Sequence, residues 1–124
     1  MKITNLKLMD ALNTLSRVSV GELPIKVAYG LKKNIDIISK ELETFEGLRK
    51  ELIEKYGDRD EEGNLKIKDG QYVVTNMEDF TKEYSELQNI ENDIEFYDMD
   101  LNALLNLDIN ISLRELNNID FLLK

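Results

Sequence analysis

Residues 25–56 read IKVAYGLKKNIDIISKELETFEGLRKELIEKY, with an apolar residue at every third or fourth position along most of their length. This spacing places the apolar side chains on one face of an α-helix of about eight turns. Pro24 suits the start of that helix, where a missing N–H costs nothing, and Gly57 suits its C-terminal cap. A stripe this long needs a partner, either a second helix of the chain or another subunit. The stripe consists of Leu31, Ile35, Ile38, Leu42, Phe45, Leu48 and Leu52.

The segment after this helix predicts a β-hairpin over residues 65–74. Apolar and polar residues alternate over 65–68, the pair Asp69 and Gly70 is a hairpin turn signal, and residues 72–74 favour strands. A two-stranded hairpin is only marginally stable alone, so we expect it to pack on a helix or another segment.

A second helix is predicted from Asn76 to about Ile94. Asn76 and Asp79 resemble a capping box, and apolar residues recur at helical spacing behind them. We expect this helix to fold back antiparallel on the first, with the β-hairpin at the tip of the helical hairpin.

The two ends of the chain predict shorter elements. Asn5 suits the cap of a helix that ends near Ser16, and residues 102–106 suggest a turn. Residues 107–111 alternate as in a strand, and Ser112 with Glu115 predicts a capped final helix through Leu122. The predicted fold class is therefore α+β and mainly helical, in a single domain of residues 1–124.

Composition excludes several kinds of chemistry. The chain has no histidine, cysteine or tryptophan, which excludes histidine catalysis, thiolate nucleophiles and zinc sites of the Cys/His type. The serines have no histidine to activate them, and no glycine-rich phosphate loop is present. We predict no catalytic residues, no cofactor and no enzymatic activity. No apolar run is long enough for a membrane span and no signal peptide is recognisable, which predicts a soluble cytoplasmic protein.

The negative charge is concentrated in one stretch. Of a net charge of −9, residues 77–100 contribute −8, from 9 acidic residues and 1 basic residue. Direct nucleic-acid binding is therefore not expected, because it requires a basic face. The candidate partner-binding residues are Glu83, Glu86, Glu91 and Asp93. These carboxylates could imitate nucleic-acid phosphates, and the alternative is a plain solvent-exposed face. A divalent-metal site of Asp93, Glu95, Asp98 and Asp100 is another interpretation, but the spacing matches no EF-hand and we predict no metal site.

A second candidate site lies at the start of the long helix. Its residues are Lys26, Tyr29, Gly30 and Lys33. Lysines and a tyrosine near a helix N-terminus could bind a small anionic ligand. The alternative is that Gly30, which costs about 1 kcal/mol in a helix relative to alanine, admits close packing of the helix over residues 5–16, with solvated lysines.

Two short motifs mark the ends of the long helix: Leu-Pro-x-Lys-Val-x-Tyr over residues 23–29 at its start and Lys-Tyr-Gly over residues 55–57 at its end. In these motifs the sequence resembles an uncharacterised family of small phage and prophage proteins of Gram-positive bacteria. The order of elements agrees over residues 5–123, although the C-terminal third matches in pattern only. The resemblance implies phage origin and a stoichiometric role, and no reaction. The matching residues are Leu23, Pro24, Lys26, Val27, Tyr29, Lys55, Tyr56 and Gly57.

The resulting hypothesis is a phage-encoded, non-enzymatic binding protein that acts on a host macromolecule, as a counter-defence inhibitor in the host cytoplasm. We also expect a homo-oligomer, formed through the helix flanks at Ile37, Ile53 and Tyr56. Two alternatives stay open: a sponge that binds a nucleotide signal at the lysine and tyrosine site, and a virion assembly or scaffold component.

Overall fold

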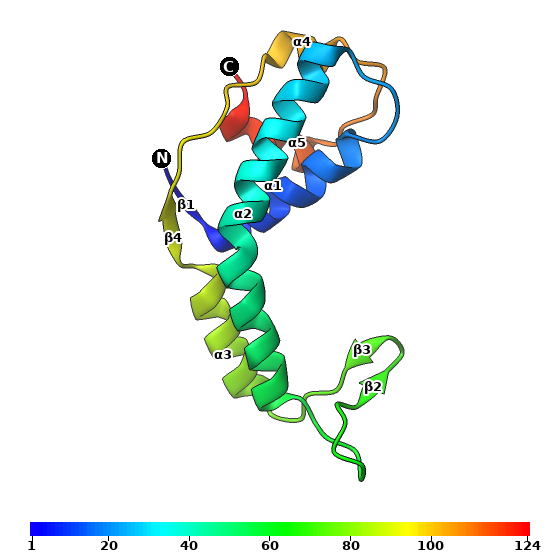
Figure 1. Cartoon of the computed structure of the whole chain (residues 1–124), viewed down its shortest axis with the longest axis vertical. Coiled ribbons are helices and arrows are strands. Elements are labelled where there is room, and N and C mark those ends of the chain that lie inside the picture. The colour runs from blue at the N-terminus through cyan, green and yellow to red at the C-terminus, as the bar shows by residue number, and fades with distance from the viewer. The chain divides into compact units, whose positions relative to one another are not determined.

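The computed structural model describes all residues, 1–124, and the chain forms two compact units. Unit 1 comprises Met1–Leu42 with Glu91–Lys124, and unit 2 comprises Glu43–Ile90. Figure 1 labels the elements of both units. The prediction of a mainly helical α+β fold is confirmed. The elements are β1 (Lys2–Thr4), α1 (Asn5–Val18), α2 (Ile25–Tyr56), β2 (Ile67–Lys68), β3 (Gln71–Tyr72), α3 (Met77–Gln88), β4 (Glu91–Asp93), α4 (Leu101–Leu105), α5 (Leu113–Ile119) and the 3₁₀ helix η1 (Asp120–Leu122).

Helix α2 has the predicted bounds and contributes to both units. Leu31, Ile38 and Leu42 of its apolar stripe are buried in unit 1, and Phe45 is buried in unit 2. Farther along, Leu48 is 42% exposed, so the stripe is less well covered towards the C-terminal end of the helix. The flank residues Ile37, Ile53 and Tyr56, predicted to be exposed, are half-buried.

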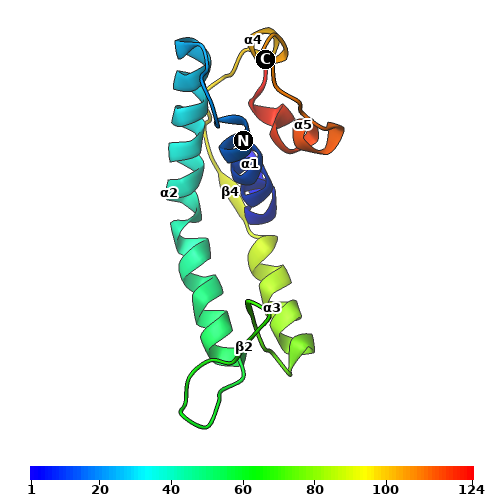
Figure 2. The same cartoon turned by 90° about the vertical axis from the view of Figure 1, so that its right-hand side faces the viewer.

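Unit 2 is an antiparallel helix pair held by aromatic side chains. Phe45 contacts Tyr84, and Tyr56 contacts Phe80, at ring-centroid distances of 6.1 and 6.2 Å. The earlier residue on α2 meets the later residue on α3, so the two helices run in opposite directions, as predicted. Phe80 and Tyr84 stack with their rings nearly parallel, 5.8 Å apart. Figure 2 shows α3 alongside the end of α2.

The predicted β-hairpin is present, and its two ends are hydrogen-bonded to Asp58, which lies just after α2. Asp69 and Gly70 have φ values of 53° and 77°, as a two-residue hairpin turn requires. The Asp58 backbone N–H donates to the Val73 carbonyl, and the Asp58 carbonyl accepts from the Lys66 N–H, both at 2.8 Å. The hairpin is therefore braced by the segment that directly follows α2.

Gly57 ends α2 without adopting the left-handed conformation that the prediction of a glycine cap implied. A Cβ at this position would lie 2.5 Å from the Ile53 carbonyl oxygen and 2.6 Å from Leu65 Cδ2. The need for glycine here is therefore close packing against the start of the hairpin, and not a positive φ.

Helix α3 is shorter than predicted. Asn76 caps its start through the Asp79 N–H, as expected, but the helix ends at Gln88 and not near Ile94. The Ser85 carbonyl accepts both the backbone N–H of Asn89, at 3.1 Å, and its side-chain amide, at 2.8 Å, so Asn89 closes the last turn of the helix. Beyond it, β4 pairs antiparallel with β1, with Ile3 opposite Asn92. The sequence analysis predicted neither strand.

The N-terminal cap of helix α1 is Thr4, and not Asn5 as predicted, so Asn5 is the first residue of the helix. The Thr4 hydroxyl accepts from the Lys7 N–H at 3.2 Å. Asn5 is buried and accepts a hydrogen bond from the Asn92 side chain at 2.8 Å. Leu8, Ala11, Leu15 and Val18 form the buried face of α1, and the helix packs against α5.

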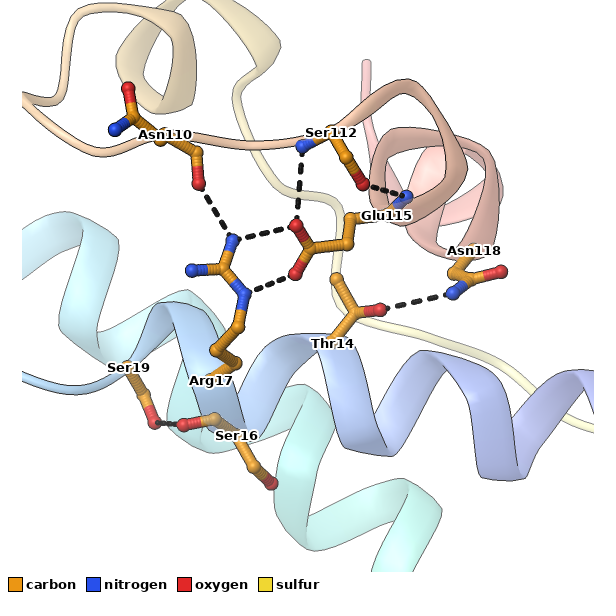
Figure 3. A network of polar contacts seen from close by, with 8 residues as sticks. All are labelled: Thr14, Ser16, Arg17, Ser19, Asn110, Ser112, Glu115 and Asn118. Carbon is orange, nitrogen blue, oxygen red and sulfur yellow. Dashed lines mark hydrogen bonds and ion pairs between the residues drawn. The ribbon is translucent and has the colours of Figure 1, made fainter.

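A polar network joins α1 to α5 and to the segment before it (Figure 3). The Arg17 guanidinium binds both carboxylate oxygens of Glu115 and donates to the Asn110 carbonyl at 2.7 Å. Arg17 holds the pKa of Glu115 below its usual range, with help from the Ser112 backbone N–H. Ser112 and Glu115 form the predicted capping box.

The predicted strand over residues 107–111 is wrong. Leu107, Ile109 and Ile111 do alternate with exposed residues, but the segment has no strand partner. One of its carbonyls, that of Asn110, is bound by Arg17 instead. The segment predicted as a turn at 102–106 largely forms α4, and the final helix is α5 continued by η1.

Candidate binding cleft

Unit 1 contains a cleft of about 590 Å³ between the start of α2 and residues 97–104. Its volume falls in the range typical of ligand pockets. Most of its lining is apolar or aromatic. The lining residues are Ile25, Lys26, Val27, Tyr29, Gly30, Tyr97, Asp98, Met99, Asp100, Ala103 and Leu104.

The first wall is formed by the first two turns of α2. Val27 is buried there, whereas Ile25 and Tyr29 are 82% and 52% exposed. Gly30 lies between them and the opposite wall, and a Cβ on it would come within 3.4 Å of Met99 Cγ and Tyr97 Cε1. The interpretation of Gly30 as a point of close approach therefore holds, but the nearest side chains belong to residues 97–99 and not to the N-terminal helix.

The second wall is the extended chain between β4 and α4, which follows the first half of α2 (Figure 1). It is fixed by Asn34 of α2, which is fully buried. The Asn34 side-chain amide donates to the Tyr97 carbonyl at 2.8 Å, and its oxygen accepts from the Tyr97 N–H at 2.9 Å. The two bonds satisfy both backbone groups of Tyr97 without a β-strand.

The backbone of Met99 is held in a similar way by the C-terminal segment. Its N–H donates to the Leu122 carbonyl at 2.9 Å, and its carbonyl accepts from the Lys124 N–H at 2.8 Å. The Met99 side chain is buried, and its neighbours Asp98 and Asp100 are exposed. This is the alternation of an extended chain, and it directs the two carboxylates away from the core.

Aromatic rings lie on both walls. Tyr29 and Tyr97 meet edge to face with ring centroids 5.5 Å apart. The Lys33 ammonium lies 5.6 Å from the centroid of the Tyr29 ring, a distance suited to a cation–π contact. Of the predicted site, the structure thus places Lys26, Tyr29 and Gly30 in the cleft lining, and Lys33 beside it on Tyr29.

The lining carries one cation, Lys26, and two carboxylates, Asp98 and Asp100. Asp98 forms an ion pair with Lys124 at 3.4 Å. Asp100 caps α4, with one oxygen accepting from the N–H groups of Asn102 and Ala103 at 2.9 and 3.4 Å. With Lys124 on Asp98 and Lys33 beside the cleft, neither sign of charge dominates, and the small anionic ligand stays a prediction.

The four acidic residues predicted to bind a partner do not form one site within either unit. Glu83 and Glu86 belong to α3 of unit 2, whereas Glu91 and Asp93 belong to β4 of unit 1. Asp93 pairs with the Met1 amine at 3.0 Å. Glu86 and Glu91 are exposed and form no ion pair. No group of three or more carboxylates lies close enough to hold a metal ion, including the set considered at residues 93–100.

Glu83 is already committed to contacts inside unit 2. The Tyr56 hydroxyl and the Lys55 ammonium, which both donate to Glu83, hold the pKa of that carboxyl below its usual range. Glu83 in turn holds the pKa values of Tyr56 and Lys55 above theirs. The cluster therefore has a structural role that joins α2 to α3.

The second wall, and Asn34 as the residue that fixes it, were not predicted from the sequence. Asn34 lies three residues after Leu31 and four before Ile38, so it stands on the buried stripe of α2. A polar residue at a core position needs a hydrogen-bond partner, and that signal was available in the sequence. The identity of the partner, 63 residues farther along, was not.

No helix of the structure is both long enough and apolar enough to cross a membrane. No family model, no curated protein and no solved structure matches the chain.

Proposed function

We propose that the chain is a non-enzymatic binding protein that captures a segment of another protein in the cleft of unit 1. The observation that carries the proposal is the exposed apolar and aromatic surface at this cleft. Ile25 and Tyr29 stand open to solvent on one wall, and Tyr97, 40% exposed, stands on the other. Exposed apolar residues that gather around a concavity are typical of an interaction site.

The polar groups of the cleft favour binding over catalysis. General acid–base chemistry needs a pair of groups held free for proton transfer. In the cleft, Asp98 is paired with Lys124 and Asp100 is used to cap α4. Neither carboxylate is therefore one of a free pair, and the cap that Asp100 provides helps to hold the wall as a preformed docking surface.

The partner that we propose is a host macromolecule, and more narrowly a host protein. The resemblance to phage and prophage proteins supports a host partner and a stoichiometric, inhibitory role against a defence system in the host cytoplasm. The cleft supports a protein over a nucleic acid, because its lining is mostly apolar and aromatic and presents no basic face for phosphates.

The proposal is tested by placing a photo-crosslinking amino acid at Ile25 and, as a matched control, at Leu113. Both positions are highly exposed, at 82% and 75%, and both belong to unit 1, but only Ile25 lines the cleft. Irradiation in a lysate of a Gram-positive bacterium is expected to give a discrete protein adduct from position 25 and none from position 113.

A second pair of variants shows whether an adduct depends on the cleft. Ala103→Trp places a large side chain in the cleft, whereas Leu105→Trp adds the same side chain to an exposed position on the same helix. The adduct should disappear with the first variant and persist with the second. Identical adducts from positions 25 and 113, or an adduct that survives Ala103→Trp, would overturn the proposal. An adduct of two copies of the chain would instead show that the cleft serves a homo-oligomer.

A further inference from the structure

The second wall of the cleft presents two carboxylates in a fixed arrangement. Asp98 and Asp100 flank the buried Met99 on an extended chain, so they project on the same side of that chain. Met99 is held by backbone hydrogen bonds to residues 122 and 124, and Asp100 is also held by its bonds to the start of α4. A fixed pair of charges costs less conformational entropy on binding than a mobile pair.

The charges that face this pair are few and exposed. Lys124 contacts Asp98 at 3.4 Å, but its side chain is 70% exposed and that of Asp98 is 65% exposed. An ion pair this open to water contributes little, so a stronger cation can replace it. Lys26 lies on the opposite wall, Lys33 lies on the Tyr29 ring, and Glu95 adds a further exposed carboxylate to the same extended chain.

The remaining lining suits an apolar side chain. Val27, Met99 and Leu104 are buried and form part of the apolar lining, and Gly30, which Met99 and Tyr97 approach closely, adds no side chain to it. Tyr29 and Tyr97 offer ring faces and edges at the sides, which attract apolar groups and guanidinium groups alike. A volume of about 590 Å³ accommodates one large side chain together with part of its neighbour.

We infer that the cleft selects a protein segment in which a large apolar side chain is followed directly by arginines. The apolar side chain enters between α2 and residues 97–104, and the guanidinium groups pair with Asp98 and Asp100. Arginine is favoured over lysine because its planar group binds carboxylates through two parallel hydrogen bonds and stacks on tyrosine rings. This inference rests on the proposed function and gives the partner its chemistry.

The test uses the absence of tryptophan from the chain. Three capped tetrapeptides each begin with leucine and tryptophan and end with two arginines, two glutamines or two glutamates. Tryptophan fluorescence, excited where tyrosine does not absorb, then reports only on the peptide. We expect the arginine peptide to bind the full chain about tenfold more tightly than the glutamine peptide, which corresponds to about 0.7 kcal/mol for each of two exposed ion pairs. The glutamate peptide should bind weakest, and raising the salt concentration should compress the differences.

The double variant Asp98→Asn with Asp100→Asn should abolish this preference. Asparagine caps helices as well as aspartate does, so α4 should keep its start while both charges are removed. The matched control is Glu41→Gln with Asp108→Asn, which removes two exposed charges of unit 1 outside the cleft. The control should bind all three peptides as the unmodified chain does.

The outcomes separate the two proposals. Equal affinity for the three peptides would overturn the inference about arginine and leave capture in the cleft standing. Loss of the preference in the control as well as in the double variant would show an effect of net charge alone and would also overturn it. Failure of all three peptides to bind, with a cleft-dependent adduct still formed from position 25, would overturn the inference but not the proposed function.

Discussion

Units 1 and 2 are stabilised in different ways. Unit 2 is one continuous segment, and its helices meet through aromatic rings and a surface cluster of Lys55, Tyr56 and Glu83. Only Phe45 and Leu87 are buried apolar residues there. Unit 1 joins the two ends of the chain, buries most of the aliphatic core, and includes the buried amide of Asn34. The cleft occurs in the unit whose walls come from distant parts of the sequence.

This difference shows which kind of structure can carry a preformed site. In unit 2 the contacts span fewer residues, 28 between Lys55 and Glu83 against 63 between Asn34 and Tyr97 in unit 1. They are made by side chains, which are used in holding the helix pair. In unit 1 an extended segment is fixed by hydrogen bonds to its backbone, from Asn34 and from residues 122–124. Its side chains are thereby left free to line a cleft.

The largest expected effect comes from Phe45→Ala, which should destabilise unit 2 by about 3–5 kcal/mol. The ring is 2% exposed and contacts Tyr84, and few other buried residues support this unit. Urea unfolding should show the loss, and hydrogen exchange should accelerate more in residues 43–90 than in residues 1–42. Leu48→Ala, at a 42% exposed position of the same helix, is the control and should cost less than about 1 kcal/mol. Uniform acceleration of exchange would show that the two units unfold together.

Asn34→Ala should cost about 2–3 kcal/mol and act on unit 1. The substitution leaves the Tyr97 N–H and carbonyl without their partners on α2. The urea midpoint should fall, and the amide of Tyr97 should lose protection from exchange. Asn13→Ala, at an exposed position on α1, should leave both unchanged. If the two variants behaved alike, the Asn34 amide would not be what fixes the second wall.

Two glycines on the same helix should respond differently because they lie in different units. Gly47→Ala should stabilise the protein by about 1 kcal/mol, since alanine favours helix and a Cβ there meets nothing within 4 Å. Gly30→Ala should gain less or nothing, because its Cβ meets Met99 and Tyr97 at 3.4 Å. Thermal unfolding of the two variants measures the difference. An equal gain in stability for both variants would mean that residues 97–99 can move to accommodate a Cβ at position 30.

The smallest effects concern pH. The pKa of Glu115 in unit 1 and that of Glu83 in unit 2 are lowered, chiefly by Arg17 and by Tyr56 respectively. The stability that each lowered pKa contributes is therefore fully present above about pH 4.3, the pKa of a glutamate in the unfolded chain. It is lost as the pH falls through the pKa of the folded state. The pKa of Tyr56 is raised by Glu83, so its contribution is present below about pH 10 and is lost as the pH rises through the folded pKa.

Unit 2 should thus lose stability in both acid and alkali. The ion pair between Arg17 and Glu115 in unit 1 should lose its stabilising effect only in acid. Glu83→Gln should weaken both dependences, and Glu115→Gln should weaken only the acid one. Urea midpoints in acid, at neutral pH and in alkali would measure this. An alkaline dependence unchanged by Glu83→Gln would show that Tyr56 owes its shifted pKa to another group.

The sequence predicted the local structure well, because its signals act over a few residues. Asp69 and Gly70 form the hairpin turn, Asn76 caps α3, and Ser112 with Glu115 forms a capping box. The predicted strand at 107–111 was wrong for a related reason. Its alternation correctly indicated which side chains turn inwards, but a strand also needs a partner, and alternation alone does not supply one.

The residues of the candidate site show the same difference between local signals and contacts with distant parts of the chain. Lys26, Tyr29 and Gly30 were identified because they lie close together near the start of a predictable helix. Tyr97, Met99 and Asp100 were not recognised as the facing wall, because their contact with α2 spans more than 60 positions and depends on a single buried amide. The pairing of β1 with β4 was missed for the same reason, since three-residue strands carry little signal of their own.

The pairing of Ile3 with Asn92 also has a kinetic consequence. Bringing these residues together from an unfolded chain means closing a loop through most of the molecule, which raises contact order and slows folding. Unit 2 lies wholly inside that loop and depends on nearby contacts, so it can form first. Once its helix pair has formed, the stretch that remains to be closed is much shorter. Folding is then expected to begin in the middle of the chain and to finish where its two ends meet, with the cleft among the last features to appear.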